Sequence, residues 1–164
     1  MKPRVLVAGV GNVFFGDDAF GVEVVRRLPA HGLPQFVKVS DFGIRGMHLA
    51  YEILSGYETV ILVDATGRGG EPGTIYLIEP DLAASGGSPD AHSMALQSVF
   101  GFMNVLGGPV PRILIVGCEP AATEEGMGLS QPVRAAVDLA IATIIKLTNE
   151  GTSATCALPF PAKS

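Results

Sequence analysis

Two uninterrupted runs of β-branched and aliphatic residues constrain the fold of this chain more than any other feature of its sequence. They are Thr59–Val63 and Ile113–Val116. A strand with one solvent-exposed face alternates polar and apolar residues, whereas a strand covered on both faces is apolar throughout. The two runs therefore predict central strands of a parallel sheet. Less uniform runs predict further strands at Arg4–Val10, Phe36–Ser40 and Thr74–Ile78.

The segments between these strands repeat apolar residues with the period of an α-helix. The repeats predict helices that begin near Phe20, Met47, Leu96 and Val133. The resulting order of elements is typical of a doubly wound α/β domain. We therefore predict a single domain over residues 1–150, with an about five-stranded, mostly parallel sheet between helices. Residues 151–164 lose the periodicity and gain small residues and prolines, which predicts a flexible C-terminal tail.

The composition excludes several classes of protein. Hydrophobic residues make up 48% of the 164 residues and charged residues only 16%, so the chain as a whole is not disordered. A net charge of -5 disfavours sequence-independent binding to nucleic acid or to an anionic membrane. The apolar runs are strand-sized, well below the roughly 18 residues of a spanning helix, and the first of them does not resemble a signal peptide. We therefore expect a cytoplasmic protein without nucleic-acid or membrane partners.

The loop after the first strand, at 9–21, opens with the Gly-x-Gly pattern of dinucleotide-binding folds. The third glycine of that pattern would fall at Phe14, so the fingerprint fails. The following helix start also carries two adjacent carboxylates, Asp17 and Asp18, which would repel a pyrophosphate unless a cation lay between them. One aspartate is explained as a cap of the first helix. The second is a candidate ligand for a cation.

Three further polar residues are predicted near the same edge of the sheet. Asp64 follows the buried run Thr59–Val63 and Asp41 follows the second strand, so both lie where strands of a parallel sheet end. Each has a simpler interpretation, Asp64 as a turn residue and Asp41 as the N-cap of the next helix. His92 precedes the third helix, although a lone histidine is more often structural than a ligand. Together Asp18, Asp64 and His92 form a set of two carboxylates and an imidazole that suits nickel, zinc, manganese or iron.

The chain resembles the hydrogenase maturation endopeptidases over almost its whole length. The most specific block is the first loop, which matches the family pattern G-x-G-N-x-x-x-x-D-[DE]-x-x-G at Gly9, Gly11, Asn12, Asp17, Asp18 and Gly21. Further blocks follow in the family's order at Asp41–Gly46, Leu62–Ala65, Pro72–Thr74, His92, Gly117–Pro120 and Gly128–Ser130. Phe42 and Arg45 depart from the commoner residues of the family, which leaves the role of Arg45 open.

The resemblance implies a five-stranded sheet between helices and a peptidase that removes the C-terminal extension of a [NiFe] hydrogenase large subunit after nickel insertion. It implies that Asp18, Asp64 and His92 bind a divalent metal, nickel, which the large-subunit precursor presents. Metal-assisted hydrolysis is then the simplest chemistry, with the cation polarising the scissile carbonyl or activating water. Asp41 is expected to act as a general base or to orient His92.

Other functions are compatible with some of the same residues. A non-catalytic assembly factor that senses nickel would bind the large subunit through the same crevice, and only a shortened product distinguishes the peptidase from it. A nucleotide-dependent oxidoreductase is disfavoured by Phe14, by the double aspartate and by a length that leaves no second domain. A cysteine peptidase is also disfavoured, because Cys118 is predicted to end a buried strand, where a thiol is usually inert.

Overall fold

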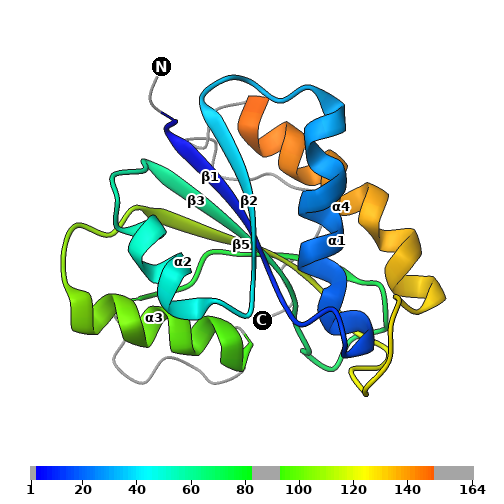
Figure 1. Ribbon diagram of the computed structural model, residues 1–164. Helices are drawn as coiled ribbons and strands as arrows, with labels where there is room; N and C mark the ends of the chain where they lie inside the picture. Colours follow the sequence, from blue (N-terminus) through cyan, green and yellow to red (C-terminus); the bar gives the residue numbers. More distant parts are fainter. Residues whose placement is uncertain (1–2, 83–92, 150–164) are drawn as a thin grey trace.

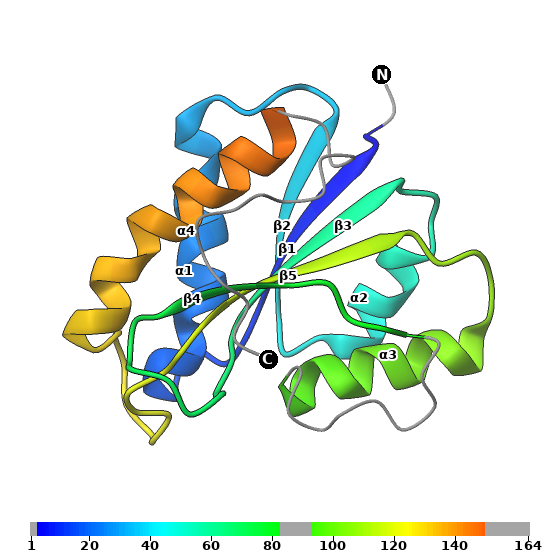
Figure 2. The ribbon, with the colours of Figure 1, turned by 180° about the vertical axis from the view of Figure 1, so that it is seen from behind.

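The computed structural model describes residues 3–82 and 93–149, which form a sheet between two layers of helices (Figures 1 and 2). The predictions for His92 and for the tail at 151–164 lie outside these residues. The sheet has the strand order β2-β1-β3-β5-β4, in which β4 alone runs antiparallel to its neighbour. The mostly parallel sheet is therefore confirmed. The strands are β1 (Val5–Val10), β2 (Val37–Gly43), β3 (Thr59–Ala65), β4 (Ile75–Ile78) and β5 (Arg112–Cys118).

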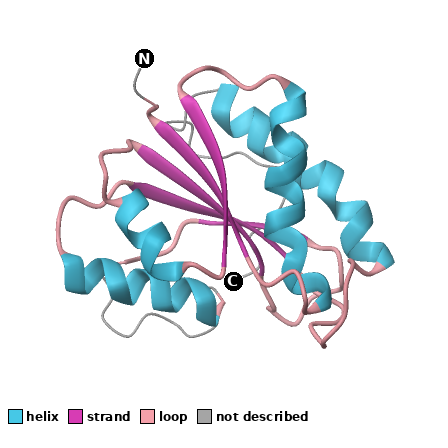
Figure 3. Cartoon of the chain, viewed as in Figure 1, coloured by secondary structure: helices cyan, strands magenta, loops and turns pink. Residues whose placement is uncertain are grey.

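Helices cover both faces of this sheet, as the doubly wound order predicts (Figure 3). On one face lie α1 (Phe20–Arg27) and α4 (Gln131–Asn149). On the other lie α2 (Gly46–Ile53) and α3 (Met94–Leu106). In the part of the chain that the structure describes, no helix is long and apolar enough to cross a membrane.

The central strands are apolar throughout because both of their faces are covered. Every residue of β1 and of β3 is buried. Along β3, Ile61 and Val63 pack with α1 and α4, whereas Val60 and Leu62 pack with α2 and α3. Burial of one such side chain stabilises the fold by about 1.5–3 kcal/mol. A polar residue in the middle of this run would therefore lose that contribution and leave a polar group without solvent.

Two glycines let the first loop pack closely against the ends of β1 and β3. A Cβ atom at Gly11, whose φ is 140°, would lie 1.8 Å from the carbonyl oxygen of Asp18. A Cβ atom at Gly21 would lie 2.0 Å from the carbonyl oxygen of Val63. The missing side chains thus bring the short 3-10 helix η1 (Gly16–Ala19) and the start of α1 onto the sheet. The close approach explains the glycines of this loop without any phosphate.

Strand β2 differs from the prediction at its carboxyl end. It continues through Asp41 to Gly43, and a bulge in its pairing with β1 leaves Phe42 as the extra residue. Asp41 therefore does not end the strand. It does not cap α2 either, because the N-cap residue of that helix is Arg45. A bulge lets a strand bend without ending, and such a bend has no simple signature in the hydrophobic pattern.

Candidate active site

Asp18 and Asp64 come together at the carboxyl end of the parallel strands. Asp18 is part of η1, and Asp64 is part of β3, where it pairs in register with Gly117 of β5. The negative charge of Asp18 helps to raise the pKa of Asp64, so the two carboxylates are within electrostatic reach of each other. The two carboxylates therefore interact electrostatically at this end of the sheet, although Asp64 is buried and lines neither of the two pockets described below.

Asp64 is almost completely buried, with a relative exposure of 1%. Its Oδ2 atom accepts a hydrogen bond from the hydroxyl of Ser93, and its Oδ1 atom has no hydrogen-bond partner among the described residues. Burial, and then the charge of Asp18, raise the pKa of Asp64 to about 8, against the opposing effects of Ser93 and of the Ala65 amide. An ionised carboxylate at this position is costly unless a cation or a further donor joins it.

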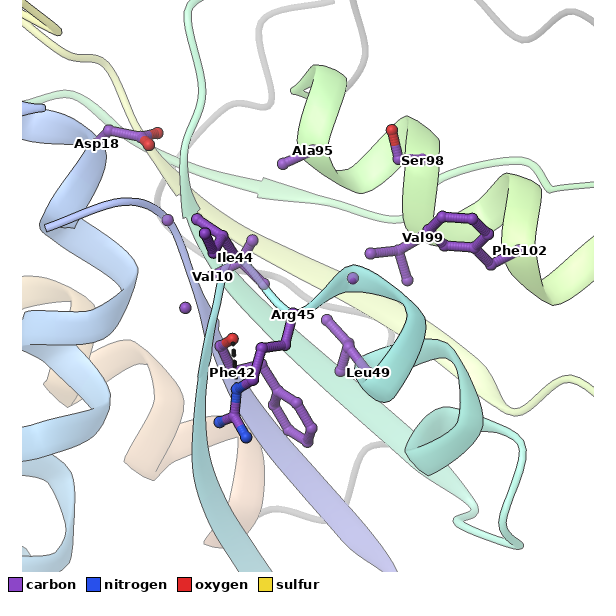
Figure 4. Close-up of a pocket in the computed structure, with 13 residues that line it drawn as sticks. Val10, Asp18, Phe42, Ile44, Arg45, Leu49, Ala95, Ser98, Val99 and Phe102 are labelled. Atoms are coloured by element: carbon purple, nitrogen blue, oxygen red, sulfur yellow. Dashed lines mark hydrogen bonds between the residues drawn. The ribbon is translucent and has the colours of Figure 1, made fainter. Parts of the chain in front are cut away.

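Asp18 is more accessible and borders a pocket. Its Oδ2 atom accepts a hydrogen bond of 2.8 Å from the backbone amide of Asn12, while its Oδ1 atom has no recorded partner within 3–82 and 93–149. The pocket has a volume of about 210 Å³ and extends from Asp18 to α2 and α3 (Figure 4). We call it the apolar pocket, since most of its lining consists of aliphatic and aromatic side chains. Asp18 and Asp64 thus each have one oxygen held by the chain and one oxygen available.

Asp17 has a structural role that differs from the predicted helix cap. Neither Asp17 nor Asp18 caps α1, whose N-cap residue is Ala19, without a side-chain hydrogen bond. Asp17 is fully buried and accepts hydrogen bonds of 2.7–3.0 Å from the amides of Ala121, Ala122 and Ser130 and from the Ser130 hydroxyl. Burial alone would raise the pKa of Asp17, but these hydrogen bonds outweigh it and the pKa is lowered. Asp17 therefore fastens the loop after β5 to the first loop.

Asp41 lies outside the apolar pocket. Its Oδ2 atom is 3.4 Å from a guanidinium nitrogen of Arg26 on α1. Both residues line a second pocket of about 200 Å³, which shares Gly11, Gly43 and Ile44 with the apolar pocket. The predicted orienting contact from Asp41 to His92 falls outside the described residues. Asp41 and Asp18 therefore line two neighbouring pockets that meet at these three shared residues.

Arg45 forms hydrogen bonds within the turn between β2 and α2. Its guanidinium group donates hydrogen bonds to the carbonyl oxygens of Asp41 and Phe42, at 2.5 and 3.2 Å. It also lies over the Phe42 ring, with 5.6 Å to the ring centroid. Figure 4 shows the side chain turned along Phe42 and away from Asp18. The residue that the sequence left without a role therefore stabilises the turn between β2 and α2.

Sequence reasoning missed Ser93, which links the site to a helix. Ser93 is the N-cap residue of α3, and its hydroxyl oxygen accepts a hydrogen bond of 3.2 Å from the Leu96 amide while its hydrogen is donated to Asp64. A serine directly before an apolar helical repeat is the usual signal of an N-cap, and this signal was available. The contact with Asp64 had no local signal.

Neither the described histidines nor Cys118 joins Asp18 and Asp64 in a group that could hold a metal ion. His31 and His48 are exposed, and within the described ranges no three His, Cys, Asp or Glu residues are grouped so as to hold a metal ion. The predicted third ligand, His92, lies outside those ranges. Cys118 is buried at the end of β5, as predicted, and burial followed by the charges of Asp17 and Glu119 raises its pKa to about 12. Its thiol is therefore protonated and inaccessible.

Solved structures of similar fold include endopeptidases. The hydrogenase maturating endopeptidase HybD from Escherichia coli matches with a TM-score of 0.73 and 28% identity, over 90% of this chain and 94% of that chain. The crevice at the carboxyl end of the parallel sheet is the usual location of an active site in such a fold. Fold and site together thus define a peptidase of the α/β class.

Sequence comparison narrows this class to one family. The family model described as hydrogenase maturation protease matches residues 22–147. The hydrogenase expression/formation protein HupD of Rhizobium leguminosarum bv. viciae is 30% identical, over 96% of this chain and 80% of its own length. A putative hydrogenase maturation protease of Methanocaldococcus jannaschii is 35% identical, over 88% of this chain and 96% of its own length. The chain belongs to the hydrogenase maturation protease family and is an endopeptidase.

Proposed function

We propose that this peptidase removes the C-terminal extension of a [NiFe] hydrogenase large subunit after nickel has been inserted. In this proposal, Asp18, Asp64 and His92 recognise the nickel ion that the precursor carries. The observation that supports this proposal is the hydrogen bonding of the two aspartate carboxylates. Asp18 and Asp64 each have one oxygen held by the chain, and the second oxygen of each has no partner in the described part of the molecule.

The chemistry of these residues fits a divalent cation. Carboxylate oxygens together with an imidazole suit nickel and its neighbours in the first transition row. The unpartnered Oδ1 atom of buried Asp64 gains a partner when a cation arrives, which offsets the cost of its burial. Because burial raises the pKa of Asp64 to about 8, a cation at this position displaces a proton at neutral pH. Nickel recognition is therefore expected to weaken as the pH falls.

The residues of the chain have distinct roles in the proposed hydrolysis. The nickel of the precursor supplies Lewis-acid polarisation of a carbonyl group. The Asn12 amide and the Ser93 hydroxyl hold Asp18 and Asp64 in fixed orientations, which reduces the entropy lost on binding. Asp41, at the other side of the crevice, is the candidate general base that accepts a proton from the attacking water.

Mass spectrometry of the large-subunit precursor tests the proposal. Nickel-loaded and nickel-free precursor are each incubated with the wild-type chain, with Asp18→Ala and with His92→Ala. Asp138→Ala serves as the matched control, because Asp138 is exposed on α4, which covers the face of the sheet opposite to α2 and α3. We expect the wild-type and control chains to shorten only the nickel-loaded precursor, and both site variants to leave it intact. Normal cleavage by either site variant, or cleavage of nickel-free precursor, contradicts the metal assignment. Binding of the precursor without a change in its mass instead indicates the non-catalytic assembly factor.

A further inference from the structure

The apolar pocket opens directly beside the candidate catalytic carboxylate. Asp18 stands at one end of it, and α2 and α3 form its far walls (Figure 4). Its apolar walls come from Val10, Phe42, Leu49, Val99 and Phe102. A group bound in this pocket would therefore lie next to Asp18.

The polar groups of the pocket are few, and two of them are already engaged. The Arg45 guanidinium is hydrogen-bonded to carbonyl oxygens of its own turn. The Ser98 hydroxyl donates a hydrogen bond of 3.2 Å to the Met94 carbonyl oxygen. A polar side chain entering the pocket would leave its own hydrogen-bonding groups unpaired, at the cost of their desolvation. The lining therefore selects an apolar group.

The size of the pocket limits what can occupy it. Pockets that bind free small molecules usually have volumes of about 300–1,000 Å³, whereas this one has about 210 Å³. The volume is suited to a single aliphatic or aromatic side chain. Such a side chain contributes little affinity alone, so it must arrive as part of a longer ligand. For an endopeptidase, the ligand whose side chains pass beside a carboxylate of the active site is the peptide substrate.

We infer that the apolar pocket binds one apolar side chain of the substrate, at a residue adjoining the scissile bond, and sets a size preference there. The inference rests on the proposed function, because it takes Asp18 as part of the catalytic centre. Continuity between the pocket and Asp18 favours the substrate over two other occupants, the chain's own residues 150–164 and a second copy of the chain. Size selection in the cleavage experiment distinguishes these two occupants from the substrate.

Gly46 is the residue that keeps the pocket open. It is the first residue of α2 and lines the pocket. A Cβ atom at this position would lie 3.5 Å from Val99 Cγ2 and 3.6 Å from Phe102 Cε2, which are ordinary contact distances. Its φ is not positive and therefore lies outside the left-handed region. A side chain at position 46 is therefore tolerated by the backbone and projects toward the pocket walls.

The structure offers a matched control for this position. Gly101 is also a helical glycine, in the neighbouring α3, but it is exposed and a Cβ atom there would meet nothing within 4 Å. Gly46→Leu and Gly101→Leu thus make the same chemical change, one into the pocket and the other into solvent. Gly46→Ala is a smaller version of the first change and remains informative if Gly46→Leu does not fold.

The experiment measures size selection on the nickel-loaded large-subunit precursor. After mass spectrometry has located the cleaved bond, the residue on each side of it is replaced in turn by Ala, Val, Leu and Phe. We expect the wild-type chain and Gly101→Leu to prefer one of the larger residues over Ala by about tenfold in kcat/KM, at one of the two positions. Gly46→Leu is expected to lose about tenfold on the larger residues and to retain cleavage of the Ala precursor. Gly46→Ala is expected to shift the preference in the same direction by a smaller factor.

Other outcomes overturn the inference. An unchanged order of preference in both Gly46 variants, or an equal loss on every precursor, shows that the pocket does not select the substrate. Faster cleavage by Gly46→Leu on all precursors shows that another occupant, such as residues 150–164 or a second copy, fills the pocket. If the wild-type chain cleaves no precursor at all, the proposed function fails. If it cleaves all of them without a size preference, only the pocket inference fails.

Discussion

The Ser93 hydroxyl donates a hydrogen bond to Oδ2 of Asp64 and leaves Oδ1 of the same carboxylate without a partner in the described residues. Ser93 also caps α3, so one side chain ties the buried carboxylate to the start of that helix. His92, the predicted third ligand, directly precedes Ser93 in the sequence. A buried carboxylate with a hydrogen-bond partner on only one of its oxygens reduces the stability of the fold. Such a local loss of stability is expected at a site that binds a ligand.

Asp64→Asn is expected to abolish one component of the pH dependence of stability. The pKa of Asp64 is about 8 in the folded chain and about 3.9 in an unfolded chain. Between these values the folded state holds a proton that the unfolded state lacks, so the free energy of unfolding falls as the pH rises and levels off above about 8. The variant carries no such proton and is expected to be about 1–3 kcal/mol more stable than the wild type at about pH 9.

Urea unfolding of metal-free wild type and Asp64→Asn, from about pH 5 to about pH 9, measures this difference. Contributions from other titrating groups cancel in the comparison between the two chains. The prediction is wrong if the two free energies of unfolding run parallel over this pH range.

Asp17 and Asp18 are adjacent in sequence, but replacement by asparagine is expected to reduce mainly the stability at Asp17 and mainly the cleavage activity at Asp18. Asp17→Asn places an amide donor among three backbone amides and a hydroxyl, and is expected to lower the free energy of unfolding by about 2–4 kcal/mol. Asp18→Asn keeps an acceptor for its single recorded partner, the Asn12 amide, and is expected to cost less than about 1 kcal/mol. Cleavage of the precursor is expected to be lost in Asp18→Asn. Equal stability of the two variants contradicts the structural role of Asp17.

Ser93→Ala is expected to affect both stability and cleavage. Loss of the N-cap of α3 is expected to lower the free energy of unfolding by about 1 kcal/mol. Loss of the hydroxyl that orients Asp64 is expected to reduce cleavage of the nickel-loaded precursor by about tenfold. Ser93→Thr keeps the hydroxyl and is expected to restore both properties. A variant that is less stable but cleaves at the wild-type rate limits Ser93 to helix capping.

Asp41→Asn tests whether Asp41 acts as the general base or serves only in the ion pair with Arg26. Because Asp41 and Arg26 are both partly exposed, breaking their contact is expected to cost less than about 1 kcal/mol. Loss of a general base is expected to slow cleavage by about 100-fold or more. Arg26→Gln is the matched control, since it breaks the same pair but keeps the carboxylate. If Asp41→Asn cleaves the precursor at the wild-type rate, Asp41 is not the general base and its role is limited to the ion pair with Arg26.

Cys118 is expected to resist alkylation in the folded protein. Its side chain is completely buried and burial raises its pKa to about 12, so little thiolate exists at neutral pH. Peptide mapping after iodoacetamide treatment is expected to show unmodified Cys118 under native conditions and modified Cys118 in urea. Cys118→Ala is expected to retain cleavage. Loss of cleavage in a folded Cys118→Ala chain would reopen the cysteine mechanism.

The class of fold, and the position of Asp64 at the end of a central strand, were predictable from local sequence patterns. The apolar run Thr59–Val63 can be satisfied only where both faces of a strand are covered, and this is the place that β3 occupies. Asp64 follows that run, so its position at the carboxyl end of a central strand also comes from the sequence. These predictions succeed because burial imposes a periodicity on neighbouring residues.

The roles of individual polar residues were decided only by the tertiary structure. Asp17 and Asp18 are equivalent in local sequence, yet Asp17 bonds to Ser130, 113 residues away, and Asp18 faces the apolar pocket. Asp41 and Arg45 likewise depend on a bulge in β2 and on a turn that no apolar pattern encodes. The physical reason is that hydrophobic burial repeats along the chain, whereas a hydrogen-bond partner is supplied by whichever distant segment the fold brings near.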